Sequence, residues 1–208
     1  MVEHGWLGPI EWAAAARPLS SEDACGDQPV AVDAGRGAAL FAVLDGLGHG
    51  REAARAALCG VEVLRRDPAE PLEALIKLCH RALAGTRGAA VTLARIDFDA
   101  DTLTWTGIGN VTANLVAKAP SGTRVRSSAR LASGIVGYRI PKTIHTQAIP
   151  IRPGDLLIIA SDGIAGNCLG SIEFAVSAKV IAEQILHRCR KETDDALVLA
   201  ARHRGSST

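Results

Sequence analysis

The sequence predicts an α+β protein whose strands form antiparallel sheets. Apolar segments of strand length fall into two groups along the chain, and two adjacent helical segments lie between the groups. A parallel sheet would instead need strands and helices that alternate regularly. The strands are too apolar to be exposed, so we expect the sheets inside and the helices outside. At 208 residues the chain is expected to form a single domain spanning residues 1–208.

The first half of the chain is predicted to form three strands followed by two helices. An alanine-rich stretch after Pro9 favours an opening strand. The strongest signal is the apolar run at 38–45, which ends in Asp45 and is followed by three glycines in five residues. Alanine-rich and leucine-spaced segments then predict helices. The expected elements are strands at 9–17, 29–33 and 38–45, and helices at about 50–66 and 70–84.

The second half begins with a meander of three strands, separated by turns at 99–101 and 109–110. Residues 119–142 are rich in Gly, Pro and Ser and predict a loop with a candidate strand at 123–128. The tail from His203 is expected to fray. The remaining expected elements are strands at 90–96, 102–108, 111–117, 143–149, 155–161 and 196–201, and a helix at about 171–190.

Composition argues against several classes of protein. The net charge of +1 provides no general attraction to nucleic acid or to a membrane. The chain has neither a secretory leader pattern nor an apolar run approaching about eighteen residues. We therefore expect a cytoplasmic protein with no nucleic-acid or membrane partner. The five cysteines are scattered and form no metal-type pairs, which predicts small buried residues in a reducing compartment.

Carboxylates recur at the ends of the predicted strands. Asp45 and Asp162 each follow an apolar strand, Asp194 and Asp195 precede the last strand, and Asp27 precedes the second. If these ends meet, like charges about 4 Å apart would repel by about 4 kcal/mol at an effective dielectric of about 20. Such a cluster needs a cation to remain ionised. Oxygen ligands without His or Cys favour Mg²⁺ or Mn²⁺.

Two divalent cations held in this way would suit phosphate ester hydrolysis. A cation pair can activate water and polarise a phosphoryl oxygen, which is the electrostatic stabilisation that this slow reaction needs. The alternative interpretation is that each acid merely solvates a turn. The joint pattern of acids at several strand ends favours the metal site.

Four segments carry a resemblance to a known family. They are Cys25-Gly26-Asp27, Val43-Leu44-Asp45-Gly46-Leu47-Gly48-His49-Gly50, Gly154-Asp155-Leu156-Leu157-Ile158-Ile159-Ala160-Ser161-Asp162-Gly163 and Asp194-Asp195-Ala196-Leu197-Val198. In this order they resemble the metal-dependent type 2C protein phosphatases, and most closely the SpoIIE-type bacterial branch. The match covers about residues 20–201. It implies a four-layer αββα sandwich, in which two antiparallel sheets lie between helices and two metals bind at one end.

The resemblance also implies a ligand set for two Mn²⁺ or Mg²⁺ ions. Asp45 would bridge both ions, and the Gly46 carbonyl would bind one of them. Asp162 and Asp194 would hold the second ion, and Asp27 would act mainly through metal-bound water. The choice of Asp194 follows the family pattern, and the sequence alone leaves Asp195 open.

The chain departs from the family at two positions. Eukaryotic members carry a His two residues after the bridging Asp, proposed as a general acid, where this chain has Leu47. His49, two residues further on, is a candidate catalytic residue, and the alternative is that it only caps the next helix. The family's phosphate-binding Arg on the first strand has no clear counterpart, and Arg17 is the nearest candidate.

The stretch between Asp101 and Asp155 contains no acidic residue. Many bacterial members place a further metal-binding acid where this chain has Gly109-Asn110-Val111, so we expect two metals rather than three. The same stretch is rich in basic residues. Three of them, Arg124, Arg126 and Arg130, are expected to bind the substrate by steering an acidic phosphoprotein, and the alternative is a solvated loop.

The expected function is metal-dependent dephosphorylation of phosphoserine or phosphothreonine. The catalytic fold takes up nearly the whole chain, as in the short stressosome phosphatases of the family. That likeness implies phosphorylated STAS-domain stressosome proteins as partners and negative feedback on a stress response as the role. The alternatives are a SpoIIE- or RsbU-like phosphatase of a free anti-sigma-factor antagonist and a catalytically inactive binding module. The sequence leaves the oligomeric state open.

Overall fold

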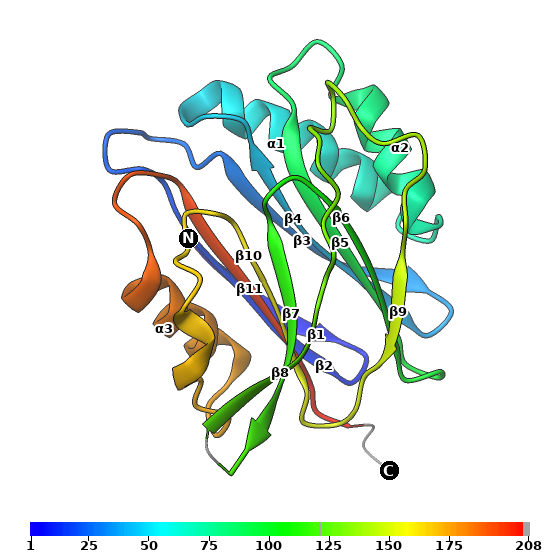
Figure 1. Cartoon of the computed structure of the whole chain (residues 1–208), viewed down its shortest axis with the longest axis vertical. Coiled ribbons are helices and arrows are strands. Elements are labelled where there is room, and N and C mark those ends of the chain that lie inside the picture. The colour runs from blue at the N-terminus through cyan, green and yellow to red at the C-terminus, as the bar shows by residue number, and fades with distance from the viewer. Residues whose placement is uncertain (121, 206–208) are drawn as a thin grey trace.

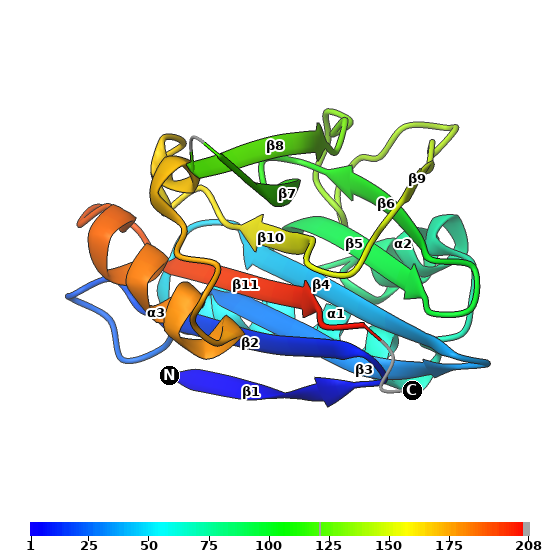
Figure 2. The ribbon, with the colours of Figure 1, turned by 90° about the horizontal axis from the view of Figure 1, so that it is seen from below.

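The computed structural model describes residues 1–120 and 122–205 and contains two antiparallel sheets between helices (Figures 1 and 2). The six-stranded sheet has the order β1-β2-β11-β10-β7-β8 and the five-stranded sheet the order β3-β4-β5-β6-β9. The predicted α+β sandwich is confirmed.

The bounds of the elements are as follows. The six-stranded sheet contains β1 (Val2–Leu7), β2 (Ile10–Arg17), β11 (Ala196–His203), β10 (Leu156–Ala160), β7 (Thr112–Ala119) and β8 (Gly122–Ser128). The five-stranded sheet contains β3 (Asp27–Gly35), β4 (Ala38–Gly46), β5 (Ala89–Asp97), β6 (Thr102–Ile108) and β9 (Gln147–Pro150). The helices are α1 (Gly50–Arg66), α2 (Leu72–Ala82), a short 3-10 helix (Cys168–Ser171) and α3 (Ala178–Cys189).

Three apolar layers hold the four layers of backbone together. Helices α1 and α2 cover the outer face of the five-stranded sheet, and α3 covers the outer face of the six-stranded sheet (Figure 2). The two sheets pack on each other through large side chains such as Phe41 and Trp105. Strand β4 is apolar on both faces because one face contacts helices and the other contacts the opposite sheet.

Several element predictions need correction. Strand β1 was not predicted, because its Val2–Leu7 segment is mostly exposed and shows no apolar alternation. Helix α3 begins at Ala178 rather than near residue 171, because the Ser177 hydroxyl caps it by accepting from the Val180 N–H. The chain does not fray at His203, which is buried in β11. The expected frayed end at 206–208 lies outside the described residues.

The prediction for the cysteines is also wrong in part. Cys168, in the 3-10 helix, forms a disulfide with Cys189 at the end of α3. Cys79 is buried, and Cys25 and Cys59 are half-buried thiols. None of the helices in the described ranges is both long enough and apolar enough to cross a lipid bilayer.

Candidate metal and phosphate site

Acidic residues from both sheets meet at one end of the sandwich. Asp27 is the first residue of β3 and lies directly opposite Asp45 in β4. Asp162 follows β10, and Asp194 precedes the neighbouring strand β11. The loop between β2 and β3 runs beside the loop that leads into β11 (Figure 1). Carboxylates far apart in the sequence are thus brought to one place, as the strand ends predicted.

Burial, and to a lesser extent mutual repulsion, raises the pKa values of Asp27, Asp45 and Asp194. Burial, followed by the charges of Asp162 and Asp194, raises the pKa of Asp45 from 3.8 to about 7. Burial, followed by the charge of Asp45, raises the pKa of Asp27 well above its ordinary value. The pKa of Asp194 is raised by burial and, more weakly, by Asp162. Each shift reports a carboxylate that is hard to ionise without a nearby cation.

Asp27 provides the clearest sign that the site suits a cation. The residue is only 2% exposed, and among the residues that the structure describes its Oδ2 atom has no hydrogen-bond partner. A buried oxygen without a partner is costly, and a divalent cation or a water bound to it would remove that cost. Within residues 1–120 and 122–205, no group of three or more His, Cys, Asp or Glu side chains is arranged so that it could hold a metal ion. The all-oxygen donor set nevertheless fits Mg²⁺ or Mn²⁺.

Asp194 and Asp195 differ in their contacts. The Asp195 carboxylate is buried and accepts hydrogen bonds from the backbone N–H groups of Leu19 and Gly26, each at 2.8 Å. Asp194 is half-buried and accepts one hydrogen bond, from the Asp195 N–H. Asp195 is therefore occupied in holding the loop before Asp27, which favours Asp194 as the ligand.

Two glycines allow the close packing that brings the acids together. A side chain at Gly46 would overlap the backbone of Ala53 in α1, and one at Gly163 would overlap the Asp195 carbonyl. Both glycines directly follow a predicted ligand, Asp45 or Asp162. The small residue after each acid is thus needed for the backbone to pass its neighbour.

His49 is the residue just before α1, but its side chain makes no capping hydrogen bond. Its Nδ1 atom instead lies 2.6 Å from the Oε1 atom of Glu22, in the loop between β2 and β3. His49 is exposed, and its positive charge, when the ring is protonated, lowers the pKa of Asp194. Glu22 could not be predicted as a partner of His49, because only the fold brings the two loops together.

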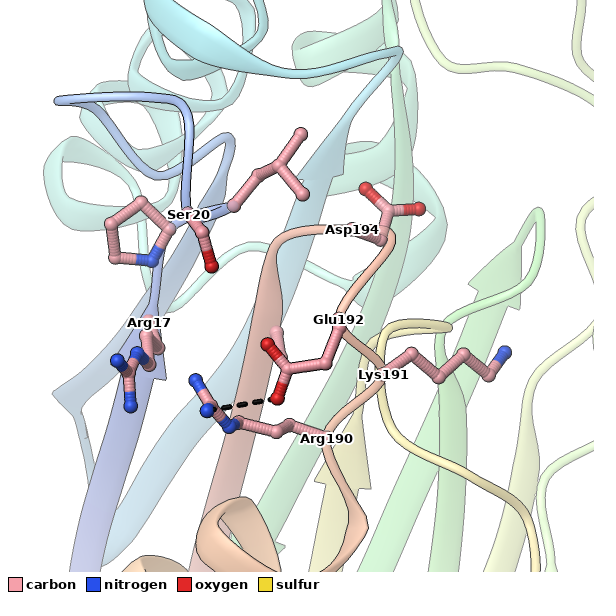
Figure 3. Close-up of a pocket in the computed structure, with 9 residues that line it drawn as sticks. Arg17, Ser20, Arg190, Lys191, Glu192 and Asp194 are labelled. Carbon is pink, nitrogen blue, oxygen red and sulfur yellow. Dashed lines mark ion pairs between the residues drawn. The ribbon is translucent and has the colours of Figure 1, made fainter.

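Arg17 lies at the end of β2, opposite Ala196 in β11. It lines a shallow pocket with Arg190, Glu192 and Asp194, shown in Figure 3. Arg190 is paired there with Glu192 at 2.9 Å. Arg17 is thus close to the acidic end of the sandwich.

The three arginines predicted to bind the substrate do not lie together. Arg126 is largely buried and forms an ion pair with Asp155, at the end of β10 remote from Asp162. Arg124 in β8 lies opposite Ala117 in β7, also toward that remote end. Arg130 follows β8 near the start of β7, on the side of the acids. The structure therefore leaves Arg130 as the one of the three near the site.

A cavity of about 190 Å³ adjoins Asp162 between β7, β10 and α3. Its apolar wall includes Ile158 and Ile185, and its polar rim includes Asn110 and Lys191. The Lys191 ammonium donates to the Asp162 carbonyl at 2.6 Å. Figure 3 shows this side chain pointing away from Arg190 and Glu192.

Comparison with known proteins identifies the family of this chain. The family model of Stage II sporulation protein E (SpoIIE) matches residues 35–204. Phosphoserine phosphatase RsbX of Bacillus subtilis (strain 168) is 27% identical over 125 residues, which is 60% of this chain and 60% of that protein. The match thus spans less than two thirds of that relative's length.

Two solved structures have the same fold. A chain from work on the bacterial stressosome, a modular system adapted to control secondary messenger signaling, gives a TM-score of 0.82 at 30% identity, covering 93% of this chain and 99% of that one. RsbX in complex with magnesium gives a TM-score of 0.80 at 22% identity, covering 97% of this chain and 99% of that one. The family match and the shared sandwich together show that the chain belongs to the SpoIIE family of PP2C-type phosphatase domains.

Proposed function

We propose that the chain is a Mn²⁺- or Mg²⁺-dependent serine/threonine protein phosphatase that holds two cations between its sheets. The observation that carries this proposal is the meeting of Asp27, Asp45, Asp162 and Asp194, with a buried Asp27 oxygen left unpaired. Family membership and the likeness to a phosphoserine phosphatase support it.

Each residue has a role that follows from its place in the fold. The charges of Asp162 and Asp194 act on Asp45, and the charge of Asp45 acts on Asp27, so Asp45 is the acid that would serve both cations, with the Gly46 carbonyl beside it. Asp27 would bind through water. When bound, the cations supply Lewis-acid polarisation of the phosphoryl group and activation of water. His49, oriented by Glu22, is the candidate proton donor to the leaving serine oxygen.

The proposed substrates are phosphorylated STAS-domain proteins of a stressosome, and the proposed role is negative feedback on a stress response. The likeness to RsbX and to a stressosome-associated chain at 30% identity supports this choice. The same catalytic site would also serve a phosphatase of a free anti-sigma-factor antagonist. Rates on purified phosphorylated STAS scaffold and on phosphorylated antagonist decide between the two, and equal or faster turnover of the antagonist would overturn our choice.

The activity itself is tested by hydrolysis of p-nitrophenyl phosphate with Mn²⁺, with Mg²⁺ and with EDTA. We expect turnover with either metal and none with EDTA. Asp45→Asn should lower turnover by at least about 100-fold. Asp23→Asn changes an exposed acid of a neighbouring loop and serves as the matched control. Metal-independent turnover, or full activity in Asp45→Asn, would exclude the proposed mechanism, and no turnover by the wild-type chain would favour an inactive binding module.

A further inference from the structure

A hydrogen bond joins the β6–β7 turn to the end of β10. The side-chain amide of Asn110 donates to Oδ2 of Asp162 at 2.7 Å. We propose that Asn110 is a positioning residue, which holds one Asp162 oxygen so that the other is presented to a divalent cation. This inference rests on the proposed function, because it requires Asp162 to be a metal ligand.

Asn110 is held rigidly by its two neighbours. The Gly109 N–H donates to the Ala132 carbonyl at 2.9 Å, and Gly109 has a φ of 102° that suits glycine. On the other side, Val111 is fully buried, and its carbonyl accepts from the Thr92 hydroxyl at 2.6 Å. The Asn110 backbone is thus fixed at both ends, so its amide is aimed before any ligand binds.

The backbone of Asp162 is fixed as well. Its carbonyl accepts from the Lys191 ammonium at 2.6 Å, and the next carbonyl, of Gly163, accepts from the Lys191 N–H at 2.7 Å. With the main chain held, the remaining freedom of Asp162 is rotation of its side chain. Among the described residues, the Asn110 amide is the side-chain group bonded to this carboxylate, so it sets that rotation.

The chemistry of an amide suits this task. An amide N–H donates to a carboxylate and favours its charged form, whereas an acid at position 110 would repel Asp162. Groups that orient metal ligands typically change metal affinity by about 10- to 100-fold when removed. Because Asn110 is exposed, we expect its removal to weaken metal binding by an amount near the lower end of this range.

The competing interpretation is that Asn110 only closes the turn between two strands. Asn114 provides a matched control, because it lies on β7, lines the same cavity and bonds through its side chain to Ser128 at 2.6 Å rather than to an acid. Removal of an asparagine that only closes the turn would lower the metal-free stability, whereas removal of a positioning asparagine would weaken metal binding.

The test is calorimetric titration of Mn²⁺ into the full chain, with thermal unfolding in EDTA as a check on folding. We expect Asn110→Ala to weaken Mn²⁺ binding by about 10-fold and to leave metal-free unfolding unchanged, while Asn114→Ala binds like the wild type. In steady-state assays, the Mn²⁺ concentration for half activity should rise about 10-fold, with kcat at saturating Mn²⁺ within about twofold.

A double-mutant cycle shows whether Asn110 acts through Asp162. In an Asp162→Asn background, Asn110→Ala should have no further effect on Mn²⁺ affinity. Equal Mn²⁺ binding by wild type and Asn110→Ala, or an undiminished effect in the Asp162→Asn background, would overturn the inference. Failure of the wild type to bind Mn²⁺ would instead overturn the proposed function.

Discussion

The carboxylate of Asp195 accepts a hydrogen bond from the backbone N–H of Gly26, although 169 residues separate them in the sequence. This contact fixes the residue directly before Asp27. It joins the start of β11 in one sheet to the start of β3 in the other. The two adjacent acids before β11 thus have different tasks, because Asp195 shapes the loop while Asp194 faces the acidic cluster.

Substituting each of these two acids separately should distinguish the one that stabilises the fold from the one that binds the metal. Asp195→Ala leaves two N–H groups without a partner, so we expect unfolding in urea to become easier by about 2–4 kcal/mol. Asp194→Asn should leave metal-free stability nearly unchanged but weaken Mn²⁺ binding measured by calorimetry. If Asp195→Ala lost Mn²⁺ binding at unchanged stability, the assignment of the two acids would be reversed.

The stability of the metal-free protein should fall as the pH rises. The folded-state pKa of Asp45, raised to about 7 by burial and by Asp162, exceeds the ordinary value of 3.8. The protonated form is therefore favoured by folding, and this stabilisation is complete below about pH 4 and lost as the pH rises through about 7. The change is on the order of 4 kcal/mol and can be measured by urea unfolding in EDTA.

Asp45→Asn is the control for that pH dependence, since the amide does not titrate. Its stability curve should be flatter than that of the wild type between about pH 4 and about pH 7. Adding Mn²⁺ should stabilise the wild type more at high pH than at low pH, because cations and protons compete for the same oxygens. A wild-type curve parallel to that of Asp45→Asn would contradict the prediction.

The role of His49 can be tested with leaving groups of different quality. A general acid matters most when the leaving oxygen is strongly basic, as for serine, and least for nitrophenolate. We expect His49→Ala to slow phosphoserine peptide hydrolysis by about 100-fold and p-nitrophenyl phosphate hydrolysis by less than about threefold. Glu22→Gln should show a smaller loss of the same kind, and Glu52→Gln, in the first turn of α1, should show none. Equal losses on both substrates would argue against proton donation.

Arg130 and Arg124 form a matched pair for substrate steering. Register places Arg124 opposite Ala117, about 17 Å along β7 from Thr112 and the acidic end. Arg130→Glu should lower kcat/KM on an acidic phosphoprotein by about 10-fold, with strong dependence on salt, while Arg124→Glu stays within about twofold. Neither change should affect p-nitrophenyl phosphate. Equal losses of kcat/KM from both variants on the phosphoprotein would contradict a substrate-binding role for Arg130.

Much of the fold could be predicted because its strongest signals are local. The apolar run of β4 and the glycines and alanines that follow determine a strand, a tight turn and a helix within one short stretch. Strand β1 gave no such signal, since pairing with β2 and not an apolar face holds it in place. The acids at strand ends were predictable because antiparallel strands return to the same edge.

Contacts between distant segments could not be predicted. The pairs Glu22–His49 and Asn110–Asp162 depend on loops that only the complete sandwich brings together. The ion pair of Arg126 with Asp155 could not be predicted either, because its buried partner lies 29 residues away. The Cys168–Cys189 disulfide likewise joins two helical segments whose spacing in the sequence matches no metal or redox motif.

The acidic cluster is divided evenly, with Asp27 and Asp45 on one sheet and Asp162 and Asp194 on the other. Cations bound between these two pairs of acids would hold the two sheets together at this end of the sandwich. Removing the ions should therefore let the two sheets separate transiently at that end first. Backbone hydrogen exchange should rise there and stay low at the end that contains the Arg126–Asp155 ion pair.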